Sequence, residues 1–504
     1  MGMVLNTNIP SIQAQRALGE SRKEMEIAME RLSTGSRINS AGDDAAGLAI
    51  VERMNSQIRG LGQATRNAND GIALIKTVEN ALVEVSGMLQ RMRELAVQAS
   101  NDTNTSTERA FADNEVTSLQ KEISRVSLNT RYNGAQVLNG SFAAKSLQVG
   151  TEAGETLDFS IGNVEASKLG AYIVDGLTQS AIAGGSSSDT DYNNGVADAD
   201  VQITSFGTTR TIDVEQYDTA KTIAKKINAV AASTQVVAST ASYAWLYSPT
   251  ANPTVGGVGA VQARLKFIDS TGAATETAAF TLTSNDVSDA IQKINAISSS
   301  TGVHASSTGD YKVLLSEKNG NDITIINTSA RTDLDVKAVG IDGITADSTE
   351  ISLGAASSSS SVDTAVVRGN LKLSSNSDFT INQQTAAEFF SNGEQSAPLV
   401  NVGTISVLTR IKASDSLAII DGAIETVSSM RGSLGSLQNR LDYTVSNLLK
   451  VTEFTTAARS RIADADFAAE TARLAKAQVL QQAGASMLSQ ANASTDTVLQ
   501  LLRG

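Results

Sequence analysis

Residues 77–99 read TVENALVEVSGMLQRMRELAVQA, and the spacing of their apolar side chains decides the fold of this part of the chain. These side chains recur in alternating steps of four and three residues, which is the spacing of a buried stripe on a coiled-coil helix. No proline interrupts the stretch. The pattern predicts one long helix from Ile75 to Ala99, whose buried stripe is formed by Val78, Leu82, Val85, Leu89, Met92 and Ala96.

Two other segments repeat this spacing. Thr105 and Glu108 have the positions of a capping box, which starts a helix, and the Asn- and Thr-rich residues 101–105 predict a turn before it. The stripe of this second helix contains Leu119, Ile123 and Val126, and a late, proline-free segment carries Leu434, Leu437, Leu441 and Leu448. The two early helices and the late helix can bury their stripes in one bundle only if the late part of the chain folds back beside the early part. The residues between them are therefore predicted to be an insertion.

The extreme ends of the chain also show helical spacing, but with few large apolar residues. A short helix with so little apolar bulk is marginal alone in water. We therefore expect both ends to be disordered in the free chain and to fold against neighbouring copies. The predicted assembly contacts are Leu18, Met25 and Leu32 near the N-terminus, and Val479, Ala483 and Met487 near the C-terminus.

The middle of the chain is rich in Ser, Thr, Gly and Ala, and alternating runs at 201–214 and 263–269 predict strands. It also contains a repeat. KINAVAASTQVVAST begins at Lys226 and is matched by KINAISSSTGVHASS from Lys293. Two related β-plus-helix modules, at about 196–240 and 260–330, are predicted, and the serine run 357–361 is expected to be a flexible connector.

These patterns together predict the α+β class: a long α-helical coiled-coil bundle formed by paired N- and C-terminal segments, with a β-rich central insertion of two related modules. Three domains are expected. They are a pair of terminal helices (1–44 and 460–504), a helical bundle with a β-hairpin (45–175 and 405–459), and the insertion (176–404).

Composition argues against an enzyme. The chain has no cysteine and one histidine, His304, so thiolate sites, histidine metal centres and Ser-His-Asp triads are not expected. No HExxH, phosphate-binding loop or EF-hand motif is present, and acidic pairs such as Asp43 and Asp44 are interpreted as helix starts. We expect no catalytic residues, metal or cofactor.

Charge and hydropathy limit the partners. The net charge of -13 argues against nucleic-acid binding. Nearly all of it lies in the middle, because residues 141–410 carry 16 Lys and Arg against 28 Asp and Glu, whereas the two ends are almost balanced. Balanced ends suit surfaces that associate. No apolar run is long enough to span a membrane, and no signal-peptide pattern is found at the start.

Four stretches resemble bacterial flagellins: NTNIPSIQAQRAL (Asn6 to Leu18), RLSTGSRINSAGDDAAGLAI (Arg31 to Ile50), ATRNANDGIALIKTVENAL (Ala64 to Leu82) and RIADADFAAETARLAKAQVLQQAGASMLSQAN (Arg461 to Asn492). The resemblance implies a structural subunit that is exported unfolded and polymerises into the extracellular flagellar filament. It implies an inner tube of paired termini, an outer tube of the bundle, and an outward-facing insertion. The implied partners are other copies of the chain, the cap protein, the hook-filament junction protein, and an export chaperone at the C-terminal helix.

The resemblance also implies a receptor surface. Gln90, Arg91, Leu95 and Glu115 occupy the positions that contact vertebrate Toll-like receptor 5 in the flagellins that this receptor detects. Subunit packing is a second interpretation of the same residues, and both roles are compatible. Two other functions stay open: a hook-filament junction protein with similar end helices, and a flagellin-like surface adhesin that binds glycans through the insertion.

Overall fold

The computed structural model describes residues 8–184, 194–249, 260–269, 272–283, 285–309, 311–329, 334–354, 363–384 and 388–501. The serine run 357–361 lies outside the described residues. Contacts divide the chain into two compact units. The terminal unit comprises Met1–Lys76, Ala144–Ser160 and Leu434–Gly504, and the central unit comprises Thr77–Ala143 and Ile161–Ser433.

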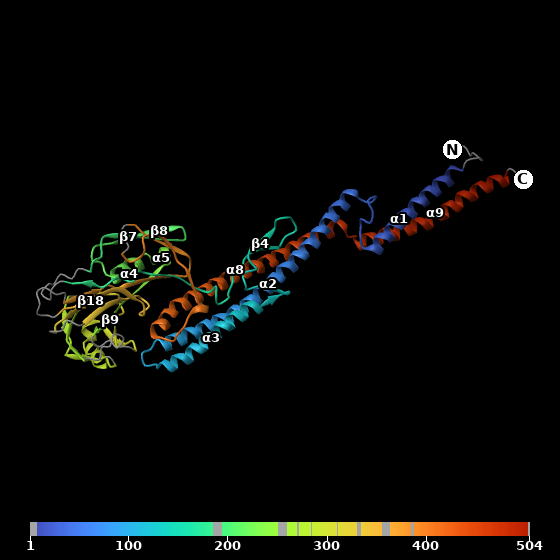
Figure 1. Ribbon diagram of the computed structural model, residues 1–504. Helices are drawn as coiled ribbons and strands as arrows, with labels where there is room; N and C mark the ends of the chain where they lie inside the picture. Colours follow the sequence, from blue (N-terminus) through green and yellow to red (C-terminus); the bar gives the residue numbers. More distant parts are fainter. Residues whose placement is uncertain are drawn as a thin grey trace. The chain divides into compact units, whose positions relative to one another are not determined.

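Five long helices come from the two ends of the chain (Figure 1). The capping box is confirmed, because the Thr105 hydroxyl accepts from the Glu108 N–H and the Glu108 carboxylate accepts from the Thr105 N–H. Asp44 likewise accepts from the N–H of Gly47, just inside the next helix, as expected of a helix start. The helices are α1 (Ile9–Thr34), α2 (Ala45–Ala99), α3 (Ser106–Asn129), α8 (Arg410–Ala463) and α9 (Phe467–Leu501). The helix predicted at 75–99 is thus the second half of α2.

The predicted stripe of α2 is the core of a bundle in the central unit. All six of its side chains, from Val78 to Ala96, are fully buried. Ile123 of α3 is also buried, whereas Leu119 and Val126 are half-buried, because α3 turns the side of Ala112 and Val116 inwards. The late leucines Leu434, Leu437, Leu441 and Leu448 are buried too, but they belong to the terminal unit. Leu448 packs there with Leu61 and Ala64.

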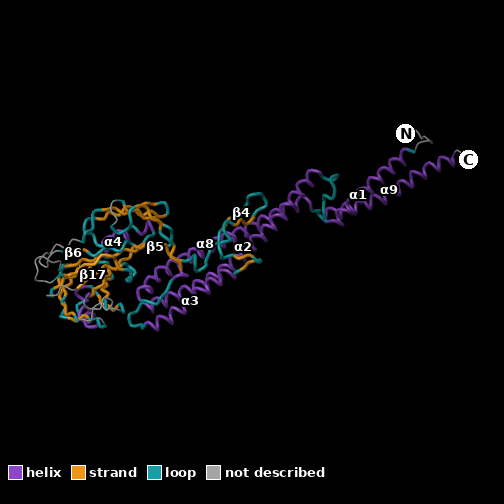
Figure 2. The backbone as a smooth tube through the Cα atoms, in the orientation of Figure 1, coloured by secondary structure: helices purple, strands orange, loops and turns teal. Residues whose placement is uncertain are grey.

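The insertion is built on antiparallel sheets (Figure 2). The largest has the order β14-β15-β9-β20-β5-β23, and β17 pairs with both β9 and β18. Its strands are β5 (Gly170–Asp175), β9 (Val237–Tyr247), β14 (His304–Ser307), β15 (Val313–Glu317), β17 (Leu334–Val339), β18 (Ala346–Leu353), β20 (Asn370–Ser375) and β23 (Leu399–Asn401). The chain enters this sheet through β5 and leaves it through the neighbouring β23, with Tyr172 opposite Leu399.

Among the described residues, the remaining strands form two further sheets and three two-stranded pairs. The four-stranded sheet has the order β22-β21-β7-β8, and the five-stranded sheet has the order β12-β11-β16-β19-β6. The former contains β7 (Ala199–Ser205), β8 (Thr208–Val214), β21 (Phe379–Gln383) and β22 (Gly393–Ser396). The latter contains β6 (Ile182–Ala183), β11 (Leu265–Ile268), β12 (Ala274–Glu276), β16 (Ile323–Asn327) and β19 (Thr364–Val367). The pairs are β1 (Arg131–Tyr132) with β2 (Ala135–Gln136), β3 (Lys145–Gln148) with β4 (Thr156–Phe159), and β10 (Val261–Ala263) with β13 (Phe280–Leu282).

The sequence repeat is confirmed as a structural repeat. Helices α4 (Ala220–Ala229) and α6 (Ser288–Asn295) are each followed by a one-turn helix, α5 (Ala231–Thr234) or α7 (Ser298–Thr301), and then by a strand. Asn228 donates to the carbonyl of Ala238 and accepts from its N–H, and Asn295 does the same with Ala305. The two helices belong to separate apolar cores.

The modules differ from two independent repeats in one respect. The strand after the first repeat, β9, is long enough to pair with β20 at its start and with β15 of the second module at its end. One sheet therefore joins both modules. No described helix is long and apolar enough to cross a membrane.

Candidate interaction surfaces

The first surface is formed by α1 and α9, which lie side by side and antiparallel (Figure 1). We call them the terminal helix pair. At one end of the pair, the Ser11 hydroxyl donates to the Asn492 side-chain oxygen at 2.9 Å, and Asn8 donates to the Ala491 carbonyl at 3.1 Å. At the other end, Arg31 Nη1 lies 3.2 Å from Glu470 Oε1. Polar contacts therefore link α1 to α9 at both ends of the pair.

The six predicted assembly residues do not all lie on the same kind of surface. Leu18, Met25 and Leu32 are half-buried on the side of α1 that bears the buried Ser11, Ser21 and Ala28. On α9, however, Val479 and Met487 are 65% and 66% exposed, and Ala483 is exposed as well. The face of α9 that turns inwards is instead made of small or polar residues, namely Glu470, Ala477, Gln481 and Gly484, with Leu474 and Leu488.

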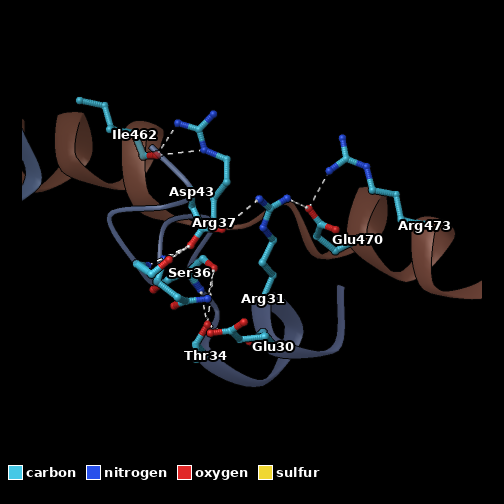
Figure 3. A network of polar contacts seen from close by, with 11 residues as sticks. Glu30, Arg31, Thr34, Ser36, Arg37, Asp43, Ile462, Glu470 and Arg473 are labelled. Atoms are coloured by element: carbon cyan, nitrogen blue, oxygen red, sulfur yellow. Dashed lines mark hydrogen bonds and ion pairs between the residues drawn. The ribbon is translucent and has the colours of Figure 1, made fainter. Parts of the chain in front are cut away.

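A polar cluster lies where α1 ends and α9 begins (Figure 3). Arg31 lies between Glu470 of α9 and Asp43 of the loop before α2, with its Nη2 4.0 Å from Asp43 Oδ1. Arg473 also binds Glu470, at 2.9 Å. Arg37 donates through its side chain to the Ile462 carbonyl, at 2.6 Å and 3.1 Å.

Asp43 is held in place by its own donors. It accepts from the N–H groups of Ser40 and Asn39 and from the Ser40 hydroxyl. These bonds, with a smaller attraction from Arg31, lower the pKa of Asp43. The donors within the turn therefore keep the Asp43 carboxylate ionised and in place, and Arg31 adds only a smaller attraction.

The second surface surrounds Arg91. Its guanidinium joins α2 to α3, with Nε 2.7 Å from Glu115 Oε1 and Nη1 2.9 Å from Glu94 Oε2. The hydrogen bond to Glu115, followed by that to Glu94, raises the pKa of Arg91, which stays charged. Gln90 is exposed beside it, but Leu95 is only 3% exposed and belongs to the buried side of α2. Three of the four predicted receptor-contact residues are thus accessible together.

An ionic cluster around the buried Lys372 was not predicted from the sequence. Lys372 of β20 lies 2.8 Å from Asp415 of α8 and 3.4 Å from Asp175 of β5. Burial opposes charging of the Lys372 amine, but attraction to the two carboxylates outweighs it and raises the pKa. A cavity of about 300 Å³ borders this cluster and is lined also by Lys318, Arg410 and Tyr243.

Among the described residues, no group of three His, Cys, Asp or Glu side chains is arranged to hold a metal ion. Long helices paired from the two ends of the chain, a buried bundle and a β-rich insertion place the protein in the α+β class. The comparisons with known proteins give the family. Residues 5–143 match the bacterial flagellin N-terminal helical region, and residues 417–502 match the bacterial flagellin C-terminal helical region.

Full-length relatives agree. The chain is 35% identical to B-type flagellin of Pseudomonas aeruginosa and 32% identical to Flagellin B of Vibrio cholerae, each alignment covering 100% of both chains. A solved structure of FliC from Burkholderia pseudomallei matches at 17% identity and a TM-score of 0.29, covering 73% of this chain and 99% of that one. The chain belongs to the bacterial flagellin family, whose members are structural subunits of the flagellar filament.

Proposed function

We propose that this chain polymerises into a flagellar filament through its terminal helix pair. The observation that carries the proposal is the apolar surface that the pair leaves in water. Ile9, Ile12 and Met29 of α1 are each more than half exposed, as are Phe467, Val479 and Met487 of α9. Large exposed apolar residues grouped on one pair of helices are typical of a surface that another molecule covers. Neighbouring copies of the chain are the partner that we propose.

The three domains expected from the sequence give the proposed arrangement in the filament. The terminal helices (1–44 and 460–504) form the inner tube and the bundle (45–175 and 405–459) forms the outer tube. The insertion (176–404), which carries most of the negative charge, faces outwards, where repulsion between copies favours solubility. The filament is extracellular.

Three further partners belong to the same proposal. The cap protein and the hook-filament junction protein are proposed to bind at the two ends of the filament. The export chaperone is proposed to cover α9 before assembly, because α9 exposes Val479, Leu480 and Met487. This stripe would otherwise promote association inside the cell.

Seeded polymerisation tests the central proposal. The intact chain, Val479→Asp and Phe206→Asp would be compared by light scattering and electron microscopy. Phe206 is a matched control, because it is also 65% exposed but lies between β7 and β8 of the insertion. We expect filaments from the intact chain and from F206D, and none from V479D. Equal polymerisation by V479D would contradict the proposal, and no filaments from the intact chain would favour the junction-protein or adhesin alternatives.

We also propose that the Arg91 surface binds Toll-like receptor 5. The exposed Gln90, Arg91 and Glu115 support this function, and the two carboxylates that bind Arg91 keep its guanidinium oriented, which suits an interface anchor. Receptor binding of Arg91→Ala should fall by at least roughly tenfold. Arg125→Ala is the matched control, because Arg125 is also exposed and paired, with Glu122 on α3. Equal affinities for both variants would rule out Arg91 as the anchor.

A further inference from the structure

The first part of α8 packs against the largest sheet of the insertion at two points, both within the central unit. Ile411, in the first turn of α8, packs with an apolar cluster that contains Tyr243 of β9. About three turns later, a Cβ on Gly422 would lie only 2.8 Å from the Cβ of Ala171 on β5. Close packing therefore joins the helix to the sheet at both ends of this stretch.

The packing is interrupted between these two points. The cavity of about 300 Å³ beside Lys372 borders Ile411, Ser414 and Asp415 of α8 but not Gly422. Most of the side chains that line it carry a charge or a hydroxyl group. A polar cavity of this size can hold water, and water between a helix and a sheet does not fix how the two are oriented. A direct contact across this part of the junction therefore matters more than it would in a packed core.

Lys372 makes that contact. Its amine lies 2.8 Å from Asp415 Oδ1 on α8 and 3.4 Å from Asp175 Oδ1 on β5. Lys372 and Asp175 are opposite each other on neighbouring strands, so this ion pair stays within the sheet, whereas the pair with Asp415 leaves the sheet and reaches the helix. The Lys372 side chain is only 11% exposed, so water screens these attractions less than those of surface pairs.

The type of contact indicates its role. A buried ion pair adds little net stability compared with apolar packing, because attraction must first offset the loss of hydration. Its geometry is demanding, however, since one amine has to lie within bonding distance of two carboxylates on different elements. We infer that Lys372 is a positioning residue, which fixes the direction of the start of α8 relative to the sheet and thereby the direction of the insertion relative to the bundle. This inference goes beyond filament formation and uses no contact of the terminal helix pair.

The two carboxylates of Lys372 supply a matched pair of variants. Asp415→Ala removes the bond from Lys372 to α8. Asp175→Ala removes an equal charge from the same cluster, but it breaks only the bond within the sheet. Each variant leaves Lys372 with one carboxylate, so the two differ mainly in whether the helix stays connected.

Distances between spin labels would compare these variants in the full chain, in frozen solution. The chain has no native cysteine, so labels attach only at introduced positions. One label pair, G87C with S306C, joins α2 in the bundle to β14 in the insertion, and a second pair, A229C with S306C, lies within the insertion on α4 and β14. Gly87, Ala229 and Ser306 are all exposed. The second pair also reports whether the insertion remains folded.

We expect Asp415→Ala to roughly double the width of the distance distribution between bundle and insertion, as for a hinge released from its constraint, and to leave the distance within the insertion unchanged. Asp175→Ala should change neither. An unchanged distribution between bundle and insertion in Asp415→Ala would overturn the inference, because packing at Ile411 and Gly422 would then fix the arrangement alone. Equal broadening in Asp175→Ala would overturn it too, since the charge of the cluster and not the link to α8 would be responsible. So would broadening within the insertion, because Asp415 would then stabilise the insertion as a whole.

Discussion

The bundle of the central unit and the terminal helix pair use the same helical spacing with different side chains. In the second half of α2, the inward positions hold Val, Leu and Met that are fully buried within one chain. In the terminal helix pair, the inward positions include Ser11, Ala28 and Gly484, and large apolar residues such as Val479 face outwards. The bundle therefore has an apolar core within one chain, whereas the terminal helix pair buries few large apolar side chains and exposes several. Periodicity alone therefore indicates a helix, and the size of the inward residues indicates whether one chain can stabilise it.

The largest expected effect is in the bundle. Leu89→Ala removes a fully buried side chain, and the cavity that it leaves should cost ~2–5 kcal/mol in the free energy of unfolding. Gln90→Ala is the control, because Gln90 is exposed one position further along the same helix. Urea unfolding followed by circular dichroism would measure both. A cost for Leu89→Ala no greater than that for Gln90→Ala would mean that the bundle is as loosely packed as the terminal pair.

A second effect tests how closely α8 approaches the sheet. A Cβ on Gly422 would lie 2.8 Å from both Ala171 Cβ and the Gly170 carbonyl oxygen, so Gly422→Ala should cost ~1–3 kcal/mol. Gly432→Ala, on the same helix with open space around it, should instead stabilise by up to ~1 kcal/mol through helix propensity. Thermal unfolding would compare the two variants. Equal stabilities would contradict close packing at Gly422.

A smaller effect is expected in the terminal helix pair. Leu18→Ala truncates a side chain that is only half-buried, so the cost in the free chain should be below ~1 kcal/mol, well under that of Leu89→Ala. Helicity of the full chain during urea unfolding would report it. A cost as large as that of Leu89→Ala would remove the distinction between the two regions.

The smallest effect is that of pH on the start of α3. The N–H and hydroxyl of Thr105 lower the pKa of Glu108 below its ordinary 4.5. A carboxylate with a lowered pKa stabilises the folded state above its unfolded pKa, and this contribution is lost as the pH falls through the folded value. Amide exchange at 106–110 should therefore be slower in the intact chain than in Glu108→Gln at neutral pH, and the difference should disappear in acid. A difference that persists in acid would show that the carboxylate charge is not involved.

Local signals in the sequence were enough to predict the long helices, the capping box and the repeated module, because each depends on residues close together in the chain. The inward face of α9 was not predicted, since it is made of Ala, Gly and Gln, while the conspicuous apolar residues lie on the other face. The burial of Leu95 was not predicted either, although Leu95 lies beside the predicted stripe of α2.

The ionic clusters had no sequence signal at all. Lys372, Asp175 and Asp415 lie on three elements that are far apart in the chain, and nothing in their local sequence distinguishes them from other surface charges. Arg31 and Glu470 are separated even more widely. Such ionic clusters can be recognised only in the structure, where the topology places their helices and strands side by side.

The adjacency of β5 and β23 has a practical consequence. The chain enters the insertion at Gly170–Asp175 and returns at Leu399–Asn401 on the next strand of the same sheet. The two attachment points are thus one inter-strand spacing apart, about 5 Å. A foreign domain whose own ends are that close could be joined at the same two strands. The segment between β5 and β23 can therefore be lengthened, shortened or replaced without changing how the chain connects to the helices. The sequence between the two strands can then change while β5 and β23, and the helices that they connect to, stay the same.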